Sequence, residues 1–160
     1  MANHSENIPG YPLGEHIKNG IADPNYSTFR IYDADFNVSP DLTPCSIDNV
    51  KNEWKKGYGV VVWATHGNQE EAWRVIDLAA LPELDDSKPS FTFQGSCHNA
   101  YPENHHNLAY ELLKHGAICT LAATRMSAHE GGDPNWPLNP QVETNHNMAY
   151  YYIEKLAKNG

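Results

Sequence analysis

Two short apolar runs, each followed by a chemically reactive side chain, constrain the fold of this chain more than any other feature. The first run, 57–65, contains Val-Val-Val-Trp without alternation and leads into His66 and Gly67. The second run, 89–96, reads Pro-Ser-Phe-Thr-Phe-Gln-Gly-Ser and leads into Cys97. Unalternated apolar runs are typical of parallel strands covered on both faces. Because the carboxyl ends of parallel strands meet at one edge of a sheet, we expect the imidazole and the thiol to lie close together.

The rest of the chain alternates between strand and helix patterns. Strands are expected over residues 28–32, 60–64, 90–94 and 117–123. Helices are expected over residues 47–56, 107–115 and 144–158, with a short amphipathic stretch over 75–81. The inward-facing helix residues are expected to be Leu108, Leu112, Leu113, Met148, Tyr152, Ile153 and Leu156. This alternation predicts an α/β fold, a three-layer sandwich with a mainly parallel sheet. In that sheet the strand over 90–94 should lie between the other two apolar strands.

Length and composition restrict the class of protein. The 160 residues suit one domain, 1–160, with residues 1–27 expected to form an irregular N-terminal segment. A net charge of −9, with only 11 Lys and Arg residues, argues against a nucleic-acid or anionic-membrane partner. No apolar run approaches the roughly 18 residues that a membrane-spanning helix needs. The first residues lack the pattern of a signal peptide, so the cellular compartment is not legible from them.

The three cysteines have different surroundings in the sequence. An odd number does not make a disulfide framework. Cys119 lies within an apolar strand pattern and is expected to be a small core residue, and Cys45 lies in a loop before a helix. Cys97 differs because it shares its predicted sheet edge with His66. The thiolate is the reactive form of cysteine and a neighbouring imidazole promotes it, so this pair predicts a nucleophilic dyad.

The order of motifs after the two strand ends is also informative. A helix carrying Glu111-Leu-Leu follows, then Gly116-Ala-Ile, then a small-residue strand that ends Ala123-Thr-Arg-Met-Ser127. This order resembles the caspase–haemoglobinase fold of clan CD cysteine peptidases, and most closely the gingipain-type peptidases of family C25. The resemblance covers about residues 28–158 and is most specific over 57–127. It implies a caspase-like sandwich, although the apolar first strand with which clan CD domains usually begin is not visible here.

The resemblance implies roles for the matched residues. His66 corresponds to the catalytic histidine and Cys97 to the nucleophile, with the N–H groups of Gly67 and Cys97 forming the oxyanion hole. Trp136 corresponds to a wall of the S1 pocket. Residues flanking that pocket would be Thr65, Gln94 and Ser96. An acidic residue sets basic P1 specificity in gingipain-type peptidases, and three candidates stay open: Asp23, Glu130 and Asp133.

The function that this resemblance implies is hydrolysis of peptide bonds by a cysteine endopeptidase, with preference for basic P1 residues. The substrate would be a peptide or protein, and the chemistry requires no cofactor. A structural calcium ion would fit the Asp-rich loops and the gingipain analogy, but no ligand set is legible. By the same analogy we expect the domain to belong to a larger, multidomain chain that is secreted or held at the cell surface.

Two other functions compete with this interpretation. A clan CD-like domain without a competent pocket would act as a non-catalytic binding or structural module. A metal-dependent hydrolase would use the cluster Cys97, His98, His105 and His106. Adjacent histidines on a helix point about 100° apart, and the spacing lacks the usual zinc pattern, so we assign no metal ligands.

Overall fold

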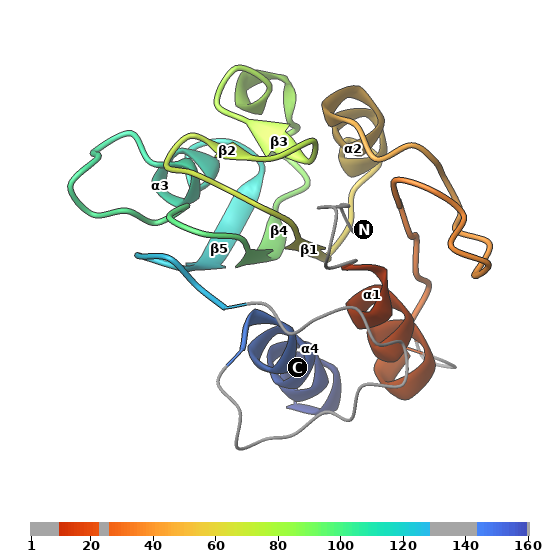
Figure 1. Cartoon of the computed structure of the whole chain (residues 1–160). Coiled ribbons are helices and arrows are strands. Elements are labelled where there is room, and N and C mark those ends of the chain that lie inside the picture. Colours follow the sequence, from red (N-terminus) through yellow and green to blue (C-terminus); the bar gives the residue numbers. More distant parts are fainter. Residues whose placement is uncertain (1–9, 23–25, 129–143, 160) are drawn as a thin grey trace.

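A three-stranded parallel sheet forms the centre of the molecule (Figure 1). The computed structural model of the chain describes residues 10–22, 26–128 and 144–159. The strands are β1 (Val60–Ala64), β4 (Ser90–Gly95) and β5 (Ala117–Ala122), in the order β1-β4-β5. Both pairings are parallel, and β1 runs in unbroken register with β4. The predicted central position of the second apolar strand is therefore confirmed.

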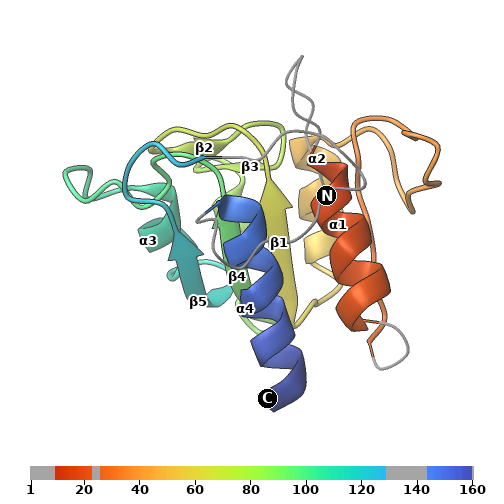
Figure 2. The same cartoon turned by 60° about the horizontal axis from the view of Figure 1, so that its bottom comes forward.

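Helices cover both faces of this sheet (Figures 1 and 2). They are α1 (Tyr11–Ile17), α2 (Ile47–Trp54), α3 (Leu108–Leu112) and α4 (Asn145–Asn159). Shorter elements are a π-helical turn (Lys18–Ala22), a 3-10 turn (Leu81–Glu83) and an antiparallel pair, β2 (Glu71–Ala72) and β3 (Ile76–Asp77). Helices α1 and α4 lie on one face, and α2, α3 and the β2–β3 pair lie on the other. The molecule is thus the three-layer α/β sandwich that the sequence predicts.

Each face of the sheet has its own hydrophobic core. Successive strand residues point to opposite faces, so Trp63 enters the larger core while Ala64 enters the smaller one. The larger core includes Val50, Trp54, Trp63, Ile76, Leu81, Leu108 and Leu112. The smaller core consists of Leu13, Ala64, Phe93 and Ala149, with partly buried neighbours. Within the described residues, no helix is both long enough and apolar enough to cross a membrane.

Side-chain hydrogen bonds fix the starts of two helices. The Ser46 hydroxyl accepts a hydrogen bond from the Asn49 N–H at 3.3 Å, which caps α2. The Asn107 side chain caps α3 in the same way, accepting from the Tyr110 N–H at 3.0 Å. Gly57, with φ +94°, turns the chain after α2 into β1.

The N-terminal segment differs from the prediction. Residues 1–27 were expected to be irregular, but residues 11–22 are helical. Pro12 occupies the first turn of α1, where its missing N–H costs nothing, and Leu13 is buried in the smaller core. The helix has 7 residues, too few for a clear hydrophobic period in the sequence.

The strand expected over residues 28–32 is wrong as well. The segment makes one isolated bridge, between Ile31 and Leu42, and does not join the sheet. Arg30 explains its position, because the guanidinium binds Glu15 of α1 at 2.6 Å and Asp41 at 3.1 Å. Among the described residues, β1 therefore remains an edge strand.

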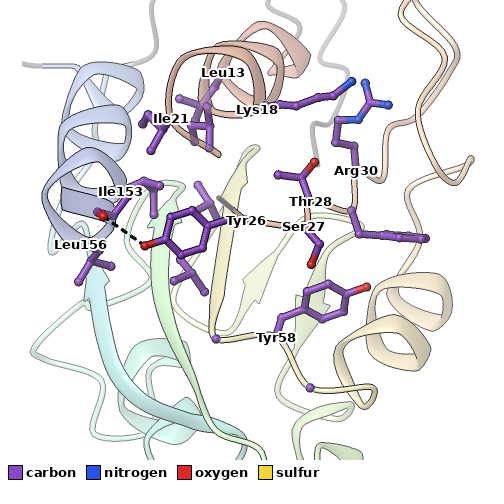
Figure 3. Close-up of a pocket in the computed structure, with 18 residues that line it drawn as sticks. Leu13, Lys18, Ile21, Tyr26, Ser27, Thr28, Arg30, Tyr58, Ile153 and Leu156 are labelled. Carbon is purple, nitrogen blue, oxygen red and sulfur yellow. Dashed lines mark hydrogen bonds between the residues drawn. The ribbon is translucent and has the colours of Figure 1, made fainter. Parts of the chain in front are cut away.

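A pocket of about 470 Å³ lies beside the start of β1 (Figure 3). Its walls come from α1, the π-helical turn, α4, residues 26–30 and residues 57–60 with Val62. Apolar side chains in the lining include Leu13, Ile17, Ile21, Val60, Val62, Ile153 and Leu156. Tyr26 spans the space between the walls, and its hydroxyl donates to the Ala157 carbonyl of α4 at 3.2 Å. The pocket lies at the amino end of β1, whereas His66 follows the carboxyl end, so it is separate from the predicted dyad.

Candidate active site

The register of β1 and β4 places the two predicted catalytic residues at one edge of the sheet. Ala64 and Gly95 are paired, and the Thr65 N–H extends the pairing by donating to the Gly95 carbonyl at 3.0 Å. His66 and Cys97 each follow this last pair by two residues. The prediction that both follow the ends of neighbouring parallel strands is therefore confirmed.

The loops that carry these residues touch each other. A Cβ placed on Gly67 would lie 2.8 Å from Ser96 Cβ and 3.0 Å from the Cys97 carbonyl oxygen. Neither separation leaves room for a side chain, so only glycine allows this approach. The turn after His66 consequently packs directly against the backbone that carries the thiol.

The Cys97 thiol is half-buried beside Ser127, which follows β5. The Ser127 N–H points at Sγ at 3.4 Å, and the Ser127 hydroxyl oxygen lies 3.8 Å from Sγ. Asn145 of α4 donates to that hydroxyl at 2.8 Å and holds it in place. The thiol in turn donates to the Ser127 carbonyl at 3.6 Å. The sulfur thus lies where the loop after β4 meets the segment after β5, beside the start of α4.

His66 lies at the surface of the same edge. Its ring is 6.2 Å from the ring of Trp73, centroid to centroid, and the two planes are tilted by 46°. The His66 carbonyl accepts a hydrogen bond from the Trp73 N–H at 2.9 Å. Trp73 is 42 % exposed, so it forms an apolar surface next to the imidazole.

The backbone around the predicted oxyanion hole is held by flanking residues. The Asn68 N–H donates to Glu71 at 2.9 Å on one loop, and the His98 N–H donates to Arg125 at 3.1 Å on the other. The backbone bonds of the described residues do not use the N–H groups of Gly67 and Cys97. The assignment of these two donors stays a prediction, and this pattern supports it.

Three residues predicted to flank the S1 pocket are buried. The Thr65 hydroxyl donates to the Trp73 carbonyl at 3.1 Å, and the Ser96 hydroxyl accepts from Trp63 Nε1 at 3.0 Å. Gln94 is 1 % exposed, and its amide has no hydrogen-bond partner among the described residues. The Thr65 hydroxyl thus joins the end of β1 to the segment after β2, and the Ser96 hydroxyl joins the loop after β4 to β1. Substrate contact by these three residues stays a prediction.

The remaining specificity residues are Trp136, Asp23, Glu130 and Asp133, and all four lie outside the described residues. The predicted pocket wall and the predicted acidic partner of a basic P1 residue thus remain expectations from the sequence.

The histidine-rich loop does not assemble a metal site in the part of the chain that the structure describes. There, no group of three or more His, Cys, Asp or Glu side chains could hold a metal ion. His106 Nδ1 instead lies 2.8 Å from the Glu111 carboxylate at the surface. His98 has φ +60°, and its ring packs 5.6 Å from that of Tyr101.

The sequence interpretation overlooked Asn99. This residue is fully buried, and its amide bonds to both strand-end loops. The only sequence signal was its position two residues after the predicted nucleophile, which by itself does not distinguish it from the other asparagines of the loop.

Comparison with known families supports the resemblance seen in the motifs. The sequence model of peptidase family C25 matches residues 9–159, which is nearly the whole chain. Comparison with curated proteins and with solved structures gave no match. The matched range includes both strand ends and the helices that cover the sheet. The chain therefore belongs to peptidase family C25 and is a cysteine-type peptidase.

Proposed function

We propose that this domain is an endopeptidase in which Cys97 is the nucleophile and His66 its proton-transfer partner. The observation that carries the proposal is the contact between the two strand-end loops, where Gly67 packs against Ser96 and the Cys97 carbonyl. Two loops in contact at one sheet edge hold an imidazole and a thiol where one substrate can reach both.

The reaction proceeds in two halves. The Cys97 thiolate attacks the scissile carbonyl carbon, and the oxyanion that forms accepts hydrogen bonds from the Gly67 and Cys97 N–H groups. His66 takes the thiol proton and gives it to the leaving amine as the C–N bond breaks. Water, deprotonated by the same imidazole, then hydrolyses the thioester and regenerates the thiol.

The proposed specificity is for a basic residue at P1. Trp136 would form a wall on which the stem of an Arg side chain stacks. A carboxylate from Asp23, Glu130 or Asp133 would bind the guanidinium. Cleavage of a peptide library varied at P1, by the wild type and by Asp23→Asn, Glu130→Gln and Asp133→Asn, tests this. A preference for Leu or Asp at P1 would contradict it, as would no effect of any of the three substitutions.

The wider setting of the domain also follows as a proposal from the family. The substrate is a peptide or protein, and neither nucleic acid nor membrane takes part. The catalytic residues require no cofactor, and a structural calcium ion would bind away from the dyad. We place the domain, 1–160, within a larger chain that is secreted or displayed at the cell surface.

Covalent labelling tests the proposed dyad directly. A peptidyl acyloxymethyl ketone with Arg at P1 should add one label to the wild type, and peptide mass analysis should find that label on Cys97. Cys97→Ala should lose the label and the activity, and His66→Ala should slow labelling by at least about 100-fold. Cys119→Ala is the matched control and should label normally, because that thiol lies within β5.

Three outcomes would contradict the proposal. Full turnover by Cys97→Ala would remove the nucleophile assignment. A correctly folded wild type that neither labels nor cleaves any peptide would favour the non-catalytic binding module. Activity that survives in Cys97→Ala but disappears after chelation would favour the metal-dependent hydrolase.

A further inference from the structure

The buried amide of Asn99 joins the two loops of the proposed dyad. Its Nδ2 donates to the Asn68 carbonyl at 2.6 Å and to the Glu71 carbonyl at 3.1 Å. Both acceptors belong to the chain that follows His66. Asn99 itself belongs to the loop that follows Cys97, two residues further on. One side chain therefore spans the gap between the two strand ends.

The other end of the amide is anchored in the sheet. Asn99 Oδ1 accepts a hydrogen bond from the Ser96 hydroxyl, which in turn accepts from Trp63 Nε1 at 3.0 Å. Trp63 lies in β1 and is fully buried. This chain of bonds leaves the amide only one orientation, because its oxygen faces a donor and its nitrogen faces two carbonyls.

The amide also lies directly beneath Gly67. A Cβ on Gly67 would approach Asn99 Nδ2 to 2.9 Å. The backbone of Asn99 is fixed as well, since its carbonyl accepts from the Ala109 N–H of α3 at 2.9 Å. The Asn99 side chain thus sets the separation between the turn at Gly67 and the loop that carries Cys97.

We propose that Asn99 is a positioning residue that fixes the His66–Gly67 turn relative to Cys97. This role rests on the proposed dyad. Asn99 does not touch substrate; it acts by holding the imidazole and the Gly67 N–H in register with the sulfur. A displacement of about 1 Å in such a site can cost about 100-fold in rate.

Asn107 is a matched control in the same loop region. Its Nδ2 also donates to two carbonyls, those of Tyr101 and Asn104, and its Oδ1 also accepts one hydrogen bond. All of these partners lie within its own loop and helix. Asn107→Ala therefore removes a similar set of bonds without separating the two strand-end loops.

The test compares kinetics, thiol reactivity and stability in Asn99→Ala and Asn107→Ala. Asn99→Ala should lower kcat about 100-fold with KM within threefold, whereas Asn107→Ala should keep kcat within threefold. The rate of Cys97 alkylation by iodoacetamide at neutral pH, followed by peptide mass, reports on the dyad without substrate. In Asn99→Ala this rate should fall at least about tenfold, as it should in His66→Ala, because the thiolate is the reactive form and a positioned imidazole promotes it. Asn107→Ala should leave the rate within threefold.

A second variant covers the case in which Asn99→Ala does not fold. Asn99→Asp keeps the volume and the acceptor for Ser96, but it places a carboxylate against the carbonyls of Asn68 and Glu71. Its activity should recover at least tenfold, relative to wild type, as pH falls and the acid becomes a donor again.

The outcomes separate the two proposals. An alkylation rate that stays unchanged in His66→Ala overturns the dyad, and this role of Asn99 with it. An alkylation rate that falls in His66→Ala but in neither Asn99 variant overturns the role of Asn99 alone. Equal losses of kcat in Asn99→Ala and Asn107→Ala would also overturn it, since both would then reflect stability only.

Discussion

The two ends of strand β1 are held by different kinds of interaction. At the amino end, Val60 and Val62 border an apolar pocket of about 470 Å³. At the carboxyl end, the chain is fixed by directional hydrogen bonds, including those from Thr65 to Trp73 and from Asn99 to the loop beyond His66. Side chains beside open space can change size with little displacement, whereas a group inside a bonded network cannot. We therefore expect the carboxyl end to tolerate far less change than the amino end.

The largest effect should come from Gly67→Ala at the carboxyl end. The added methyl would lie 2.8 Å from Ser96 Cβ and 2.9 Å from Asn99 Nδ2, and both neighbours are buried. The turn must therefore shift. We expect kcat/KM to fall about 100-fold and the free energy of unfolding to fall by about 1–3 kcal/mol. Peptide hydrolysis and urea unfolding measure the two quantities.

Gly59→Ala provides the control just before the other end of the strand. No atom lies within 4 Å of a Cβ on Gly59. The free energy of unfolding should change by less than about 0.5 kcal/mol, with unchanged activity. Equal effects of the two substitutions would remove the contrast between the ends of β1.

The next effect in size tests apolar packing, as opposed to the hydrogen bonds of the strand-end loops. Leu13 of α1 is 2 % exposed and belongs to the smaller core. Leu13→Ala should lower the free energy of unfolding by about 2 kcal/mol, near the low end for such substitutions because the pocket beside it already provides space to relax. Leu13 shares this core with Ala64, the last residue of β1. Because the substitution leaves the hydrogen bonds of the two strand-end loops in place, kcat should stay within twofold at a temperature where the variant is folded. A large loss of kcat would show that apolar packing under β1 also positions these loops.

Much of the fold could be predicted because its signals are local. The apolar run over 60–64 coincides with β1. The helix expected from residue 47 begins there, because the Ser46 hydroxyl accepts a bond from the nearby Asn49 N–H. What failed depends on distant contacts. Met148 and Leu113, expected to face inward, are each 48 % exposed. The apolar period of a helix allows several rotations, and packing against the sheet decides among them.

The segment over 75–81 shows the same limit on local reasoning. Its amphipathic pattern gave no helix; it contributes Ile76–Asp77 to the β2–β3 pair instead. The pair is stabilised by the larger core, in which Val75 and Ile76 are fully buried. Burial in tertiary contacts thus overrode the local preference.

For the site, the pairing of the strands could be predicted from the sequence, but the contacts between the loops could not. Parallel pairing of two apolar strands is enough to bring His66 and Cys97 to one edge. The approach of Ser127 to the sulfur and the bridge made by Asn99 depend on loop conformations that no periodic pattern encodes. The sequence could therefore indicate which residues meet, but not what holds them there.

The buried thiol of Cys45 should make the free energy of unfolding depend on pH. Burial raises the pKa of Cys45 to about 11, above its ordinary value of 9.0. The folded state thus favours the thiol, so this contribution to stability is complete below pH 9 and is lost as pH rises toward 11. At a pH near 10, wild type should lose about 1 kcal/mol more than Cys45→Ala, relative to pH 8. Urea unfolding of both proteins at the two pH values measures this, and parallel losses would contradict the assignment.

The smallest expected effect concerns Gln94, at the carboxyl end of β4. Its amide is 1 % exposed and has no hydrogen-bond partner among the described residues. An unpaired buried amide destabilises the folded state, so Gln94→Met, which is similar in volume and apolar, should raise the free energy of unfolding by about 0.5–1 kcal/mol. Thr92→Val on the same strand is the control. The Thr92 hydroxyl already has a partner, the Cys119 carbonyl at 3.3 Å, so loss of this hydroxyl should not stabilise the folded state.

Gln94→Met also tests the predicted contact of Gln94 with substrate. If kcat/KM for a basic P1 substrate falls while stability rises, the amide is kept unpaired for substrate at a cost in stability. If kcat/KM stays within twofold, that contact is wrong, and the carboxyl end of β4 tolerates an apolar side chain at Gln94 even though the neighbouring end of β1 does not tolerate one at Gly67.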